Sequence, residues 1–214
     1  MIQDARNYDE LNAMVTNPRS EPYDEYFDSF DITRKQKQDR ISLAESLEDK
    51  FLPILIFLFT MRQYRIEIDW ESIVGRFDSG YREAAGNFLT VDDYMDSRIR
   101  TFSYDVTDST RNHLDDPYYY SLDRAMFMSE EESAGGFAHE DFIQAILTGK
   151  TKKKWMDIRD KRERDTHRRV GGTVKPIMEP FVVGDSLMLY PKDSETFGAE
   201  AKEICGCRCS VLYF

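Results

Sequence analysis

Hydrophobic residues recur at a spacing of three to four positions through the middle of the chain, from about residue 41 to residue 150. This period collects apolar side chains on one side of a helix, so it predicts a mainly helical body. A first helix is expected after the N-cap residue Ser42, a second from Trp70 to Leu89, and a third after the N-cap residue Thr90. The apolar positions that define them are Leu43, Leu47, Phe51, Leu52, Leu55 and Ile56, then Ile73, Val74, Phe77, Tyr81 and Ala84, then Tyr94, Ile99 and Phe102.

The second half of this body contains a pair of glycines that predicts an interruption. A helix is expected from Ser121 to Ser133, a break at Gly135-Gly136, and a short helix from His139 to Leu147. The strongest apolar run, Phe51 to Met61, has eleven residues, whereas a membrane-spanning helix needs ~20. This run is interpreted as a buried helix with Pro53 near its first turn, where proline is tolerated.

The last third of the chain changes to short apolar stretches separated by turn residues. Val174 to Met178 and Ser186 to Tyr190 are expected to be strands, with turns at Gly184-Asp185 and Pro191 to Asp193. The final residues form another expected strand. The fold class is therefore α+β: a mainly helical N-terminal body (41–150), followed by a small α+β C-terminal module (151–214) with short antiparallel strands.

Residues 1–40 lack a sustained apolar period and form a separate region. Residues 1–50 carry 12 acidic and 7 basic side chains, and four aromatic residues, Tyr23, Tyr26, Phe27 and Phe30, fall within eight positions. Such an acidic arm either stays extended in solvent or orders on a partner, with the aromatic residues as anchors. The density of aromatic residues favours an arm that orders on a partner.

Composition and charge limit the function classes. Hydrophobic residues make up 41% of the 214 positions, and the formal net charge of -11 argues against a protein that coats nucleic acid with its whole surface. Positive charge gathers between Lys152 and Lys175, where ten basic residues stand beside four acidic ones. This run is either a solvated face or a contact surface for packaged DNA or an acidic partner. The candidate binding residues are Lys152, Lys153, Lys154, Arg168 and Arg169.

The N-terminus from Met1 to Arg6 is polar and precedes no apolar stretch, so no secretory signal is expected. The chain is therefore expected to fold in a reducing cytoplasm and to have no membrane partner. In that compartment its three cysteines need not pair as disulfides. His113 and His139 have no partner of matching spacing and are expected at the surface or in loops.

A specific string of residues runs through the C-terminal module. A Trp is followed by an Asp-x-Arg-x-Arg-x-x-His cluster, a Gly, a Pro-Phe pair, a Tyr-Pro-x-Asp turn and a Cys-Arg-Cys. In order and spacing, over roughly 60 residues, this string resembles phage minor head proteins of the Mu F-like head-morphogenesis family. The matching positions are Trp155, Asp160, Arg162, Arg164, His167, Gly172, Pro180-Phe181, Tyr190-Pro191-Lys192-Asp193 and Cys207-Arg208-Cys209.

The resemblance implies a minor capsid protein of the virion that acts structurally, not as an enzyme. Such a protein would lie at the portal vertex or the inner head surface and serve procapsid assembly and DNA packaging or ejection. Its partners would be the portal protein and the major capsid or scaffold protein, with packaged DNA as a further contact. It would be in the host cytoplasm during assembly and in the virion afterwards.

Three residues depart from the family pattern. Gly206 stands where an Asn usually precedes the Cys-Arg-Cys, Gly171 replaces a common acidic residue before the glycine, and Cys205 is additional. All three lie close to the histidine or the cysteines of the string.

The cysteines are candidate metal ligands. Cys205, Cys207 and Cys209 alternate with other residues, so a strand would direct all three thiols to one face. With His167 nearby they would form a zinc site of three cysteines and a histidine, or of two cysteines, a histidine and a carboxylate. The alternative is buried free thiols, because Cys-x-Cys is shorter than the spacing of standard zinc motifs. A zinc-stabilised adaptor module is accordingly one hypothesis for the function.

The cluster of Asp160, Arg162, Arg164 and His167 has two interpretations. If residues 155–169 are helical, Asp160, Arg164 and His167 share one face, and the acid can pair with Arg164 in a structural network. Alternatively, the cluster is a nuclease-like or toxin-like site that cleaves phosphodiesters, with His167 as general acid or base and the arginines stabilising charge. The structural role is the leading hypothesis.

Overall fold

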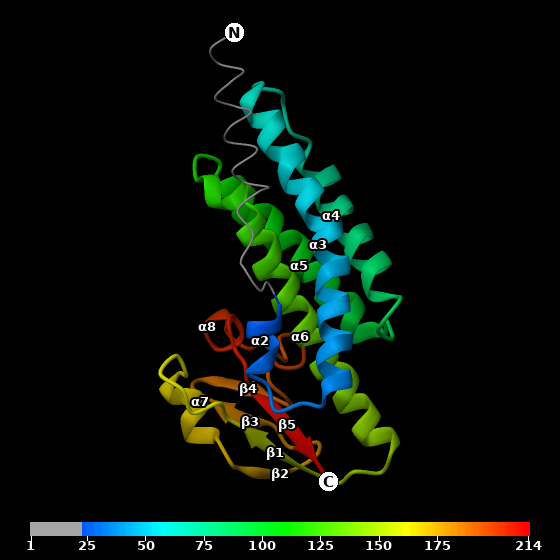
Figure 1. Cartoon of the computed structure of the whole chain (residues 1–214), viewed down its shortest axis with the longest axis vertical. Helices are drawn as coiled ribbons and strands as arrows, with labels where there is room; N and C mark the ends of the chain where they lie inside the picture. The colour runs from blue at the N-terminus through cyan, green and yellow to red at the C-terminus, as the bar shows by residue number, and fades with distance from the viewer. Residues whose placement is uncertain (1–22) are drawn as a thin grey trace.

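The computed structural model describes residues 23–214, in which a body of long helices lies next to a small module with two antiparallel sheets (Figure 1). The body comprises α2 (Asp24–Asp28), α3 (Arg34–Gln63), α4 (Trp70–Ala85), α5 (Asp93–Asn112), the 3-10 helix η1 (Pro117–Tyr120) and α6 (Leu122–Leu147). The module comprises β1 (Lys152–Met156), α7 (Asp165–Val170), β2 (Val174–Pro176), β3 (Phe181–Val183), β4 (Ser186–Met188), α8 (Ala201–Ile204) and β5 (Ser210–Tyr213). The expected α+β fold class is confirmed.

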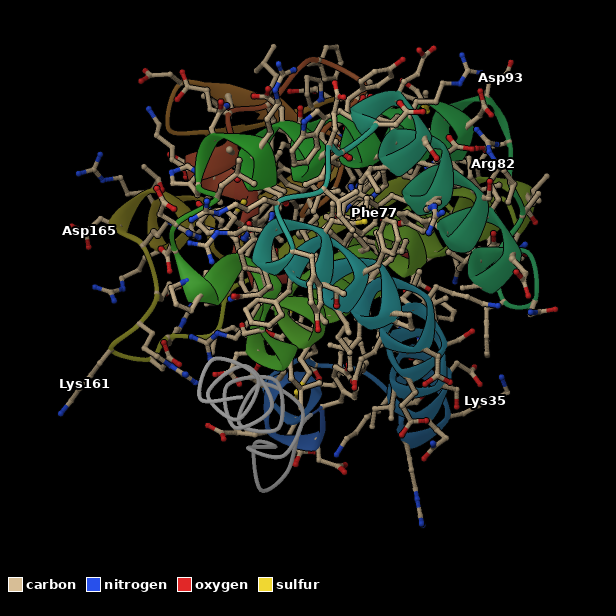
Figure 2. All side chains as sticks on the ribbon, turned by 90° about the horizontal axis from the view of Figure 1, so that it is seen from above. Lys35, Phe77, Arg82, Asp93, Lys161 and Asp165 are labelled. Atoms are coloured by element: carbon tan, nitrogen blue, oxygen red, sulfur yellow. The ribbon has the colours of Figure 1, made fainter. Side chains whose placement is uncertain are left out.

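The core of the body forms along one stripe of α3. Aromatic residues from three helices meet there: the ring of Phe51 on α3 lies 5.7 Å from that of Phe77 on α4 and 4.9 Å from that of Phe102 on α5. Figure 2 shows Phe77 enclosed between helices, whereas Lys161 and Asp165 project away from the molecule. Side chains without any exposed surface complete the stripe, among them Leu43, Leu47, Leu55 and Leu58 of α3.

The N-terminal end of α3 lies earlier than the sequence pattern predicts. The expected start at Ser42 is wrong, because α3 begins at Arg34 behind the N-cap Thr33. The Thr33 side chain accepts a hydrogen bond from the Gln36 N–H, and the Gln36 side chain accepts one from the Thr33 N–H, which is a capping box. Pro53 therefore lies inside a helix of 30 residues. The expectation that Pro53 stands near the first turn of its helix is wrong as well.

The interruption expected in α6 is absent. The break at Gly135-Gly136 is wrong, because α6 runs unbroken from Leu122 to Leu147. A Cβ on Gly135 would overlap the Arg98 guanidinium, and one on Gly136 would overlap the Leu89 side chain. The glycines thus serve close packing against α5 and the loop that precedes it, and the packing maintains the helix despite their low helix propensity.

The aromatic residues of the expected arm pack against the chain's own helices. Tyr23 and Phe27 are buried, and the rings of Tyr26 and Phe30 lie within 5.6 Å of that of Phe27. Together they cover residues of α3 and α6, among them Ile41, Ala44, Leu122, Met126 and Ala134. The anchors therefore bind within the chain. Of the rest of the expected arm, residues 34–40 belong to α3, and residues 1–22 lie outside the described residues.

The module is built on β1, the central strand of the sheet β2-β1-β5, while β3 and β4 form a separate hairpin. The helix considered for residues 155–169 is wrong: β1 occupies Lys152–Met156, and only Asp165–Val170 is helical. Side chains alternate along β1, and both Lys153 and Trp155 are fully buried. This alternation has a period of two, which a short run of lysines hides from a hydrophobicity pattern.

Candidate metal centre

Three buried side chains meet inside the module: the imidazole of His167 and the thiols of Cys207 and Cys209. His167 lies on α7, and the two cysteines directly precede β5. Nδ1 of His167 is 3.5 Å from Sγ of Cys207 and 3.4 Å from Sγ of Cys209, and the three ligand atoms lie within 4.8 Å of one another. Imidazole nitrogen and thiolate sulfur are transition-metal ligands, so this group could hold a metal ion.

A carboxylate fixes the orientation of the imidazole from its other side. Oε2 of Glu203, on α8, lies 3.2 Å from Nε2 of His167 and accepts a hydrogen bond from the Thr166 hydroxyl at 2.8 Å. Glu203 is buried. With Nε2–H donating to this carboxylate, Nδ1 is left with a free lone pair directed at the two sulfurs, which is the arrangement that metal-binding histidines usually have.

Electrostatics favour a thiolate at Cys207. A hydrogen bond from the Cys209 thiol, which outweighs the opposing effect of burial, lowers the pKa of Cys207 well below its usual value. The pKa of Cys209 is raised by this same hydrogen bond, by burial and by the charge of Cys207. Burial opposes protonation of His167, but the hydrogen bond and charge of Cys207 outweigh it and raise the pKa of the imidazole. The group therefore already stabilises one of the two thiolates that metal binding requires.

The cysteine segment is a turn and not a strand, which corrects the expectation for Cys205. Gly206 has φ +67, and its N–H donates to the Glu131 carboxylate on α6 at 2.9 Å. This turn leaves Cys205 exposed and outside the group formed by Cys207 and Cys209. Glycine and asparagine are the residues that adopt a positive φ most readily, so Gly206 adopts this turn without strain.

The remaining residues of the Asp-Arg-Arg-His cluster point in different directions. The expected pair of Asp160 with Arg164 is wrong: Asp160 pairs with Arg208 at 2.7 Å, and Arg164 donates to the carbonyl of Cys205. The Arg162 side chain is 70% exposed. Because residues 157–164 form a loop, the helical spacing assumed for these residues does not apply. Asp160 and Arg164 thus contact the segment that carries the cysteines, whereas Arg162 is mostly exposed to solvent, and of these three only Arg162 and Arg164 line the small cavity beside His167.

The basic run contains one residue that cannot belong to a surface. Lys153 is fully buried, and its ammonium donates to the Leu189 carbonyl at 2.6 Å. Burial lowers the pKa of Lys153 to about 8. Its assignment to a DNA or partner contact is therefore wrong. Four candidates remain accessible to solvent, with Lys154 half-buried, and their role in binding stays a prediction. They are Lys152, Lys154, Arg168 and Arg169.

A second histidine joins the body to the module. His139 on α6 is buried, contrary to the expectation of a surface or loop position, while His113 is exposed as expected. Nδ1 of His139 lies 2.8 Å from the Tyr190 hydroxyl, Nε2 lies 2.8 Å from the Asp92 carboxylate, and the ring stacks on Tyr94. Tyr190 begins the Tyr-Pro-x-Asp turn, so this turn anchors the module to the body.

Glu131 of α6 forms the other junction between body and module. Its carboxylate accepts hydrogen bonds from the Tyr26 hydroxyl at 2.9 Å, the Lys192 ammonium at 2.6 Å and the Gly206 N–H at 2.9 Å. The side chains of Glu131 and Lys192 are 9% and 2% exposed. One buried carboxylate therefore connects α2, the Tyr-Pro-x-Asp turn and the cysteine turn.

Sequence reasoning missed the three carboxylates that support the site: Glu131, Glu163 and Glu203. Glu203 stands two residues before Cys205, and Glu163 stands four residues before His167, so proximity in sequence was an available signal for both. Glu131 is distant in sequence from every other residue of the site, and no local pattern marks it.

Comparison with known protein families, with curated proteins and with solved structures gave no match for this chain. Within residues 23–214, no helix combines the length and apolar character needed to cross a membrane.

Proposed function

We propose that this chain is a structural minor capsid protein of a phage head, whose C-terminal module is held together by a zinc ion. The observation that supports this most is the position of the residues that resemble the Mu F-like string. Trp155 and Phe181 pack together beside His167, with the Trp155 ring 5.9 Å from the imidazole and 5.1 Å from Phe181. The string thus surrounds one buried group of metal ligands and connects it to the helical body.

Zinc is the ion that the ligand set and its spacing favour. Zinc bonds of about 2.3 Å to sulfur and 2.0–2.1 Å to nitrogen, at a tetrahedral angle, separate the two ligand atoms by about 3.6 Å. The separations of 3.4 and 3.5 Å from one nitrogen to two sulfurs are close to this value. Two nearly equal separations from one nitrogen are also what three ligands of a shared metal ion would give.

Burial favours a structural over a catalytic use of this site. His167, Cys207 and Cys209 are each at most 5% exposed, so a substrate has no access to them. The phosphodiester-cleaving alternative is less favoured, because Asp160 pairs with Arg208 and the cavity that Arg162 and Arg164 share with His167 has a volume of only about 20 Å³. The adaptor hypothesis is compatible with the proposal, since a zinc-stabilised module can serve as the docking part of a capsid protein.

Metal content tests the zinc part of the proposal. The protein purified without chelator should contain one zinc ion per chain, and Cys207→Ser should reduce this strongly. Cys205→Ser is the matched control and should keep the full content, because Cys205 lies outside the group. Zinc content far below one per chain in the unmodified protein would contradict this part.

Partner binding tests the capsid part. Co-expressed with the portal, major capsid and scaffold proteins of the same phage, the chain should co-purify with the portal or with procapsids. Exposed basic residues such as Arg169 are candidates for this contact, and charge reversal there should weaken it. Absence of binding to the portal and to procapsids at every salt concentration tried would refute the capsid role.

A further inference from the structure

The carboxylate of Glu163 lies at the metal centre without a complete set of partners. Its side chain is 2% exposed, and Oε2 accepts a hydrogen bond from Nε of Arg168 at 3.2 Å. Among the described residues, Oε1 of Glu163 has no hydrogen-bond partner, although it is fully buried. A buried carboxylate oxygen without a partner is costly, so such an oxygen indicates a missing ligand.

The space next to this oxygen belongs to the metal centre. A small cavity of about 20 Å³ is lined by Glu163 together with His167, Cys207 and Cys209, and by neighbouring residues that include Arg162, Arg164 and Arg208. A cavity of this size holds one water molecule or one metal ion. Glu163 and the three candidate ligands therefore border one small space, and those three already present ligand atoms to one another.

We propose that Glu163 is the fourth protein ligand of the metal centre, so that the site is closed by two cysteines, one histidine and one glutamate. This inference rests on the zinc site proposed above. The Glu163 oxygens lie outside the group of atoms within 4.8 Å of one another, so metal binding draws the carboxylate inward by rotation of its side chain. The opposing Arg168 side chain is 52% exposed, and loss of its pair with Glu163 costs little because solvent screens it.

Four protein ligands define the kind of site. Structural zinc sites have four protein ligands, whereas catalytic sites keep one position open for water. Coordination by Glu163 fills the open position, leaves no metal-bound water and makes the centre a structural one. It also gives the unpartnered Oε1 atom its partner.

Metal titration of the full-length protein with zinc and with cobalt(II) tests the inference. Glu163→Gln should weaken zinc binding, measured against a competing chromophoric chelator, by about 100-fold or more, since loss of even an outer hydrogen-bond partner costs 10–100-fold. The control Arg168→Gln removes the ion pair and keeps the carboxylate, so its zinc affinity should stay within a few-fold of the unmodified protein. Circular dichroism of each variant checks that it folds.

A gain-of-ligand variant makes the test independent of lost stability. Glu163→Cys should bind cobalt(II) with three thiolates in place of two, and its thiolate-to-cobalt charge-transfer absorption should rise by about half. Unchanged zinc affinity in Glu163→Gln, or no added charge-transfer absorption in Glu163→Cys, would overturn the role of Glu163 while zinc binding itself remains. If the unmodified protein binds neither metal, both the zinc site and this inference fail.

Discussion

The carboxylate of Glu131 allows a quantitative test of how the helical body and the module are joined. Glu131→Gln removes the charge that neutralises the Lys192 ammonium, which is 2% exposed. An unpaired charge left in a buried pair destabilises a protein by about 3–5 kcal/mol. With a urea slope of about 2–3 kcal/mol per M, the unfolding midpoint should fall by about 1–2.5 M.

The assay is urea unfolding at neutral pH and a fixed zinc concentration, followed by circular dichroism. Glu45→Gln makes the same chemical change at an exposed position of α3 and should move the midpoint very little. Removing both charges with Glu131→Gln and Lys192→Met should cost less than the two single changes added together, by about 1–3 kcal/mol. Strictly additive costs, or a Glu131→Gln midpoint equal to that of Glu45→Gln, would refute the reasoning.

Three further predictions concern buried groups. Gly135→Ala should destabilise the protein in thermal melts, because its Cβ meets a buried guanidinium, whereas Gly75→Ala, with open space around it, should stabilise by up to about 1 kcal/mol; equal effects would contradict this. Because the folded pKa of Lys153 is about 8 against 10.5 when unfolded, the cost of burying its ammonium is constant below pH 8 and is relieved as the pH rises towards 10.5. Relative to Lys153→Met, the unmodified protein should gain about 3 kcal/mol of unfolding free energy over that window, and parallel pH profiles would exclude the effect. His139→Phe should cost about 1–3 kcal/mol by leaving a buried hydroxyl unpaired, and Tyr190→Phe on that background should recover part of it; no recovery in urea unfolding would count against the pairing.

Much of the fold follows from periodicity that is visible in the sequence. The helical stripe through Leu43, Leu47 and Phe51 was predicted because a 3.6-residue period needs no knowledge of distant residues. The wrong predictions fall where a contact with a residue distant in sequence determines the local structure. Gly135 was interpreted as a helix breaker because Arg98, which fills the space beside it, lies 37 positions earlier in the chain.

Part of the metal centre was also predictable. His167, Cys207 and Cys209 were chosen from residue type and alternation, and they do come together. Cys205 was included wrongly, because the positive φ of Gly206 turns the chain and ends the alternation that a strand would give. Glu203 and Glu163 were missed despite their proximity in sequence to the candidate ligands, since acidic residues are common on surfaces and the sequence does not show that these two are buried.

The turn from Tyr190 to Asp193 has a consequence for how this protein can vary between relatives. Loops usually accept substitutions and insertions because few contacts depend on them. In this turn, Tyr190 holds His139, the Lys192 ammonium holds Glu131, and Asp193 accepts hydrogen bonds from the N–H groups of Leu189 and Thr196. One inserted residue would misalign all these partners at once. The turn should therefore change more slowly in evolution than the helices around it, and a sequence lacking it would join body and module differently.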